Sequence, residues 1–234
     1  MPRENPTKSA FVLIDMEEGF VNPMGGHCIK NALATVPACE KALAAARRKG
    51  IPVFFVKRIY RADGSDVEMT RYANWLKGGK PVTPASRGAN SAMAPKGLAP
   101  LPGDYTIIKP RWSAFFGTEL DLILRRLGVR NVILAGTTTP NCIRSTCYDA
   151  LSLEYNTILI EDCCSSQTEE IQRVNMIDMK NVGAILMTEA DFENYDENTV
   201  PDMSELVRNE VMNSGDAPEP FGELSGECGW IDRW

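Results

Sequence analysis

Histidine is almost absent from this chain of 234 residues: His27 stands alone beside seven cysteines, none of them in a C-x-x-C spacing. Structural zinc sites use Cys and His ligands at such spacings, so a zinc centre would be hard to assemble here. No apolar run approaches the ~18 residues of a membrane span, and residues 1–8 are polar. These absences predict a cytoplasmic protein that does not enter a membrane, with its cysteines mostly as buried thiols.

Clusters of positive charge are also lacking. The net charge is −6, and residues 191–234 hold 12 acidic and two basic residues, which leaves the rest of the chain mildly basic. Because no Lys/Arg stripe with interleaved aromatic residues occurs, nucleic acid is not an expected partner. A mass of 25.8 kDa with 44% hydrophobic residues predicts one medium-sized domain.

Short β-rich apolar runs alternate with amphipathic stretches along the chain. The expected strands are 10–14, 52–56, 105–108, 131–135, 157–160 and 183–187, and the expected helices are 36–49, 118–127, 142–153 and 168–180. Apolar strands joined by helices imply a parallel sheet with helices on both faces. The sequence therefore predicts an α/β fold, a three-layer, doubly wound, six-stranded parallel sheet of Rossmann-like type.

Two stretches depart from this rhythm. A long segment at about 58–104, rich in Gly and Pro, is expected to be an excursion or lid, with a short helix at 67–76 whose Tyr72 and Trp75 cap a pocket. Residues 1–190 are expected to form the domain and 191–234 an acidic C-terminal extension. That extension has a helical stretch at 203–212 and the aromatic residues Phe221, Trp230 and Trp234, which would suit docking on another subunit.

Three reactive side chains directly follow expected strands or lie close behind them. Asp15 follows the first strand, Lys109 the third, and Cys142 opens a helix after the fourth. Each also has an ordinary explanation: Asp15 fits a turn residue, Lys109 a solvated surface lysine and Cys142 a thiol packed in the core. Ligands of doubly wound sheets bind at the carboxyl ends of the strands, so the three are expected to converge. A carboxylate, an ammonium and a thiol at a helix N-terminus, whose dipole favours the thiolate, would make an activated nucleophile.

Three segments carry a family resemblance: 14–20 (IDMEEGF), 109–118 (KPRWSAFFGT) and 136–150 (GTTTPNCIRSTCYDA). Together they resemble the isochorismatase-like cysteine hydrolases, and the likeness runs in order from about residue 10 to 188. The family includes nicotinamidases, N-carbamoylsarcosine and ureidoacrylate amidohydrolases and biuret hydrolases. The resemblance implies a catalytic triad of Asp15, Lys109 and Cys142.

The same resemblance implies further features of the site. A cis peptide bond is expected at Thr137-Thr138, and the backbone N–H groups of Thr138 and Cys142 would form an oxyanion hole. Phe20 is expected to lie against the substrate and Trp112 near it, although core packing explains either aromatic residue nearly as well. Relatives are often dimers or tetramers, so a homo-oligomer is expected.

The chain departs from the family pattern at two places. Nicotinamidases place an Asp and two His around a metal after the second strand, but residues 57–63 (KRIYRAD) contain no histidine, so no metal and no other cofactor is expected. Glu17 stands where the family usually has Gln. Isochorismatase itself does without the cysteine, so Cys142 favours amide chemistry.

The expected function is cysteine-dependent hydrolysis of a small amide or ureido compound, with release of ammonia through a thioester. Arg58, Arg61 and Arg111 are candidates for binding a substrate carboxylate, because a guanidinium group recognises a carboxylate with two hydrogen bonds; each also fits a solvated surface arginine. Three other readings stay open: a non-catalytic binding member of the fold, a phosphatase, and a thiol-redox protein. A phosphatase would need its Thr/Ser motif before its Lys motif, whereas here Lys109 precedes Thr137. A thiol-redox protein would need paired cysteines, but Cys142 and Cys147, five residues apart, do not face each other on a helix.

Overall fold

The computed structural model describes residues 7–215, so Phe221, Cys228, Trp230 and Trp234 lie outside the described residues. The six strands are β1 (Ser9–Ile14), β2 (Val53–Lys57), β3 (Tyr105–Ile108), β4 (Asn131–Thr137), β5 (Asn156–Ser165) and β6 (Ile185–Met187). All neighbouring strands pair in parallel, in the order β3-β2-β1-β4-β5-β6. The prediction of a doubly wound, six-stranded parallel sheet is confirmed.

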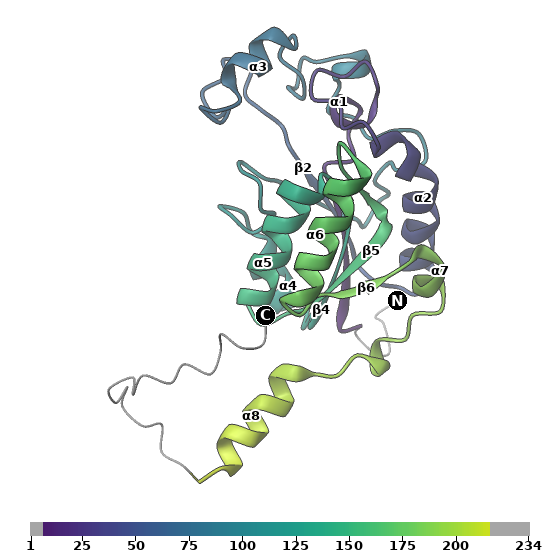
Figure 1. Ribbon diagram of the computed structural model, residues 1–234, viewed down its shortest axis with the longest axis vertical. Helices are drawn as coiled ribbons and strands as arrows, with labels where there is room; N and C mark the ends of the chain where they lie inside the picture. Colours follow the sequence, from purple (N-terminus) through teal and green to yellow (C-terminus); the bar gives the residue numbers. More distant parts are fainter. Residues whose placement is uncertain (1–6, 216–234) are drawn as a thin grey trace, which may run out of the picture. The chain divides into compact units, whose positions relative to one another are not determined.

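Helices cover both faces of the sheet, which gives the three layers seen in Figure 1. On one face lie α2 (Ala32–Arg48) and α7 (Glu189–Glu193); on the other lie α4 (Leu120–Arg126), α5 (Arg144–Ser152) and α6 (Glu169–Asn181). The short helices α1 (Glu18–Val21) and α3 (Tyr72–Lys77) lie beyond the carboxyl ends of the strands.

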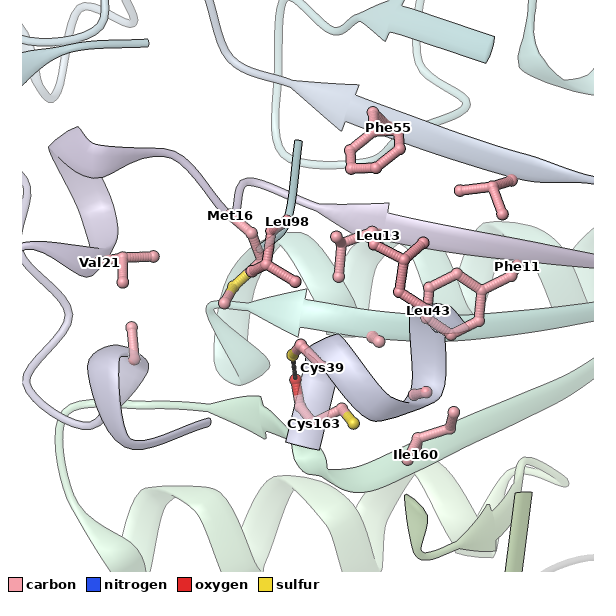
Figure 2. Close-up of a cluster of buried hydrophobic side chains, with 14 of the residues drawn as sticks. Phe11, Leu13, Met16, Val21, Cys39, Leu43, Phe55, Leu98, Ile160 and Cys163 are labelled. Atoms are coloured by element: carbon pink, nitrogen blue, oxygen red, sulfur yellow. Dashed lines mark hydrogen bonds between the residues drawn. The ribbon is translucent and has the colours of Figure 1, made fainter. Parts of the chain in front are cut away.

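Alternation along β1 divides the core between the two faces. Phe11 and Leu13 face α2, whereas Val12 and Ile14 face the opposite layer, and all four are buried. Figure 2 shows the α2 side, where the Cys39 thiol donates a hydrogen bond to the Cys163 carbonyl oxygen at 3.3 Å. The strand is apolar throughout because it is buried on both sides, as in other parallel sheets with two helical layers.

The excursion, residues 58–104, is packed rather than open. Its Tyr60, Val67, Trp75, Val82 and Leu98 belong to the core on the α2 side. Trp75 was expected to cap a pocket, but it is fully buried and its Nε1 donates to the Pro81 carbonyl oxygen at 3.0 Å. The helix in this segment, α3, also starts five residues later than predicted.

The described chain forms two compact units, divided after Pro201. The residues just before that point belong to the first unit: Phe192 is buried and stacks on Phe11 with 5.9 Å between ring centroids. In the second unit, α8 (Met203–Asn213) exposes Met203, Leu206, Val207 and Val211. No helix within residues 7–215 is long and apolar enough to cross a membrane.

Candidate active site

Asp15, Lys109 and Cys142 meet at the carboxyl edge of the sheet. Strand order changes direction between β1 and β4, and ligands of doubly wound sheets bind outside this point. Asp15 directly follows β1, with its backbone N–H bonded to the Val56 carbonyl oxygen and a φ of 51°. Lys109 directly follows β3 and its N–H bonds to the Lys57 carbonyl oxygen. Backbone bonds to β2 therefore hold both residues in place.

Cys142 lies in a π-helical turn, Thr139–Ile143, between β4 and α5. The expected helix thus begins at Arg144 rather than at Cys142. Thr146 bonds to the Cys142 carbonyl oxygen at 2.6 Å and accepts from the Ala114 N–H at 2.9 Å. This bridge fixes the turn that carries Cys142 against the segment that follows Lys109. The peptide bond between Thr137 and Thr138 is cis, as the resemblance implied.

Lys109 links the other two side chains. Its Nζ lies 2.8 Å from Asp15 Oδ2 and 3.4 Å from Cys142 Sγ, and it donates to the Arg111 carbonyl oxygen at 3.1 Å. The exposed fractions are 0% for Lys109, 1% for Asp15 and 3% for Cys142. A desolvated ammonium therefore stands between a carboxylate and a thiol, within reach of both.

Burial is the largest influence on the Cys142 thiol and raises its pKa, and the Asp15 carboxylate raises it further. Lys109 and Arg58 act in the opposite direction without reversing the shift. Burial and the Asp15 charge thus hold the pKa of the Cys142 thiol above its ordinary value, against the helix-dipole effect that favours a thiolate. Asp15 is the neighbouring carboxylate to which the thiol proton can move.

Glu17 is a second buried carboxyl group beside Asp15. Its Oε2 accepts from the Arg58 backbone N–H at 3.0 Å, while its Oε1 is buried without a hydrogen-bond partner. Burial, and then the charge of Asp15, raise the pKa of Glu17 well above its ordinary value. The protonated form of Glu17 is therefore favoured by its surroundings, and its Oε2 remains a hydrogen-bond acceptor.

A cavity of about 580 Å³ opens over Asp15 and Cys142, and the buried Lys109 contacts both from outside its lining. Its lining includes Asp15, Phe20, Thr138 and Cys142, together with His27 from the loop after α1 and Arg71, Asn74 and Lys77 from α3 and the residue before it. Volumes of ~300–1,000 Å³ are usual for small-molecule sites. A second hollow, of about 590 Å³, lies by the amino ends of β2 and β3 and contains no cysteine, so the chemistry points to the first.

The expected site residues divide into two groups. Phe20 and Thr138 line the cavity with Asp15 and Cys142, whereas Lys109, Arg58 and Trp112 are not among its lining residues. Arg58 is buried and ion-paired with Glu68, and Trp112 lies under the Arg71 guanidinium, 6.0 Å from the ring centroid. Arg61 is exposed, and Arg111 donates to the carbonyl oxygens of Asp66 and Pro110.

Sequence reasoning missed the residues that form the cavity wall. His27, Arg71, Asn74, Lys77 and Gln167 come from three separate segments. The one feature of the sequence that could have pointed to them is the helix predicted within the excursion, because residues 71, 74 and 77 lie on one face of such a helix. Burial lowers the pKa of His27 to about 4, so it is a neutral ring in the wall.

Among residues 7–215 no group of three or more His, Cys, Asp or Glu side chains is placed to hold a metal ion. The six described cysteines are all free thiols. The cavity lining holds the side chains of Asp15 and Cys142, which Lys109 contacts, and the partly exposed thiol of Cys28.

The isochorismatase domain model matches residues 9–191. The chain belongs to the isochorismatase family. It is a hydrolase of that family, and the matched stretch runs from the start of β1 into α7, so it includes all three reactive residues.

Individual relatives agree with this assignment. The isochorismatase-family hydrolase is 37% identical over 177 residues to a probable inactive nicotinamidase of Arabidopsis thaliana, covering 75% of this chain and 89% of that protein. It is 31% identical over 202 residues to a ureidoacrylate amidohydrolase of Azorhizobium caulinodans, and the match covers 79% of this chain and 88% of that protein. A crystal structure of an isochorismatase family protein from Desulfovibrio vulgaris superposes with a TM-score of 0.74 at 38% sequence identity. The superposition covers 80% of this chain and 97% of that one.

Proposed function

We propose that this isochorismatase-family hydrolase cleaves the C–N bond of a small, non-peptide amide or ureido compound, with Cys142 as nucleophile. One observation carries the proposal: Lys109 Nζ lies 2.8 Å from Asp15 Oδ2 and 3.4 Å from Cys142 Sγ, and these last two residues line a cavity. The similarity to a ureidoacrylate amidohydrolase supports the substrate class.

The first half-reaction forms a thioester. Asp15 accepts the thiol proton, and the Cys142 sulfur attacks the carbonyl carbon, so that the carbonyl oxygen becomes an oxyanion. The backbone N–H groups of Thr138 and Cys142 hold that oxyanion and Lys109 stabilises the developing charges. When the C–N bond breaks, Asp15 returns its proton to the departing nitrogen, which leaves as ammonia.

The second half-reaction frees the enzyme. Asp15, again a carboxylate, accepts a proton from a water molecule, whose oxygen attacks the thioester carbon. The C–S bond breaks, sulfur takes the proton back from Asp15, and an acid is released. An N-carbamoyl substrate that has lost ammonia in the first half-reaction would yield an N-substituted carbamate, which decomposes to carbon dioxide and the parent amine.

Ammonia release tests this function. Purified wild type and Cys142→Ala are compared on nicotinamide, N-carbamoylsarcosine, biuret, ureidoacrylate, maleamate and oxamate. We expect release from at least one compound, with turnover lowered by 10³-fold or more, on the order of the loss of a catalytic nucleophile, in Cys142→Ala. Wild-type turnover in Cys142→Ala would refute the nucleophile. Silence on every compound, together with a Cys142 that iodoacetamide does not alkylate, would favour a non-catalytic binding protein.

A further inference from the structure

The cavity holds positive charge that the protein does not balance. Two of its lining residues, Arg71 and Lys77, are cations, and its one acidic lining residue, Asp15, is already paired with Lys109. Within residues 7–215, neither the Arg71 nor the Lys77 side chain forms a hydrogen bond or an ion pair. Arg71 helps to lower the pKa of Glu68, but that carboxylate is ion-paired with Arg58, and Lys77 is exposed. A cation that faces a small cavity without an ion-pair partner marks a place where an anion would be stabilised.

Other cations near the site are already engaged. Arg58 is paired with Glu68, Lys109 with Asp15, and the Arg111 guanidinium donates to two backbone carbonyl oxygens. The sequence pointed to Arg58, Arg61 and Arg111 for a substrate carboxylate, yet none of the three lines the cavity. The free cations instead come from α3 and the residue that precedes it.

Arg71, Asn74 and Lys77 form a polar face toward the cavity. They recur every three residues and all three line it, while Trp75 between them is buried in the core. The Arg71 guanidinium lies over the Trp112 ring at 6.0 Å, which supports it from below without using its hydrogen-bond donors. A half-buried arginine held in this way is suited to bidentate recognition of a carboxylate.

We propose that the substrate carries a carboxylate at the end opposite its scissile amide, and that Arg71, with Lys77 beside it, binds that carboxylate. The inference rests on the proposed function for the amide end, since Cys142 and Arg71 line the same cavity. It narrows the substrate class to monoamides of short dicarboxylic acids and N-carbamoyl amino acids. Simple neutral amides lack the group that α3 is built to receive.

Protection of Cys142 from alkylation tests the anion site without requiring turnover. Iodoacetamide labelling of Cys142 is followed by peptide mass spectrometry, because the partly exposed Cys28 also lines the cavity. Succinate and its neutral diamide, succinamide, are the competing probes. We expect succinate to protect and succinamide not to, and Arg71→Gln to weaken succinate protection by about tenfold or more, as for a lost charged hydrogen bond. Lys77→Gln should weaken it less.

Arg61→Gln is the matched control, because Arg61 is an exposed arginine of the same excursion that does not line the cavity. Succinate protection in this variant should equal that of wild type. Equal protection by succinate and succinamide, no protection by either, or unchanged protection in Arg71→Gln would overturn the anion site.

Ammonia release separates this inference from the proposed function. Succinamate and succinamide share the scissile amide and differ in the carboxylate. Cys142-dependent release that favours succinamide would leave the hydrolase standing and refute the carboxylate site. Succinate protection that needs Arg71, with no Cys142-dependent release from any amide, would leave the anion site standing and refute the amidohydrolase.

Discussion

Arg58, directly after β2, forms an ion pair with Glu68 of the excursion, and the two side chains are only 1% and 3% exposed. The Tyr60 hydroxyl donates to Glu68 at 2.6 Å. Burial alone would raise the pKa of Glu68, but Arg58 and Tyr60 outweigh it and hold that pKa below its ordinary value. A desolvated charge pair thus fastens the excursion to the sheet.

Removing one member of this pair should be costly. Arg58→Met leaves Glu68 as an uncompensated buried charge, so we expect a loss of ~3–5 kcal/mol of stability, measured by urea denaturation. Arg48 and Glu193 form an exposed pair, with side chains 59% and 47% exposed, and Arg48→Met should cost under ~1 kcal/mol. Equal costs for the two variants would show that the buried pair contributes nothing special.

Glu17 should make stability depend on pH. Because its folded pKa is raised above the ordinary 4.5, the folded state binds the proton more tightly, and its stability falls as pH rises from about 4.5 toward the folded pKa. Glu17→Gln removes this term. The variant should gain on wild type by up to ~1.4 kcal/mol per pH unit in that window.

Urea denaturation at several pH values from 5 upward measures this difference. The exposed carboxyl of Glu161 gives a matched control, since Glu161→Gln should run parallel to wild type. A parallel course for Glu17→Gln as well would mean that Glu17 is ionised in the folded protein.

Gly136 marks a close approach of β4 to β1. Its φ is +119°, and a Cβ there would collide with the backbone carbonyl of Ile14, the residue before Asp15. We expect Gly136→Ala to prevent soluble folding or to lower stability well beyond conformational strain. Gly183, with φ +107° and open space around it, isolates the strain alone, so Gly183→Ala should lose only ~1–3 kcal/mol. Similar melting temperatures for the two variants would contradict the clash.

Trp75 tests whether the excursion is part of the core. It is fully buried, so Trp75→Ala should cost ~3–5 kcal/mol of unfolding free energy. Its neighbour Leu76 is 45% exposed, and Leu76→Ala should change stability by under ~1 kcal/mol. A Trp75→Ala variant as stable as wild type would indicate that this segment opens as a lid.

The sheet was predictable from the sequence because its strands are apolar on both faces. The least accurate boundary is that of β5, predicted at 157–160 and found at Asn156–Ser165, where Glu161 and Asp162 interrupt the apolar pattern. The pairing of β4 with β5 is irregular at this point, so the strand continues past exposed acids that periodicity interprets as its end. The short helices α1 and α7 carry too few residues to show a period.

The site was predictable in its floor and not in its wall. Asp15 and Lys109 directly follow strands, and a parallel sheet brings such positions to one edge whatever the loops do. The contribution of Arg71 depends on how the excursion folds back, which is governed by contacts such as Arg58 with Glu68. No local pattern reports those contacts.

The division between floor and wall has a consequence for how specificity can change. Asp15 and Lys109 directly follow strands and Cys142 lies in the turn after β4, whereas Arg71, Asn74 and Lys77 belong to one continuous insertion. We therefore expect that exchanging this one stretch changes the part of the cavity wall that Arg71, Asn74 and Lys77 form, while His27 and Gln167 stay in place. The replacement must keep an acid for Arg58 and a large apolar side chain in place of Trp75. Substitutions in the 58–104 insertion can thus change which substrates bind while Asp15, Lys109 and Cys142 stay unchanged.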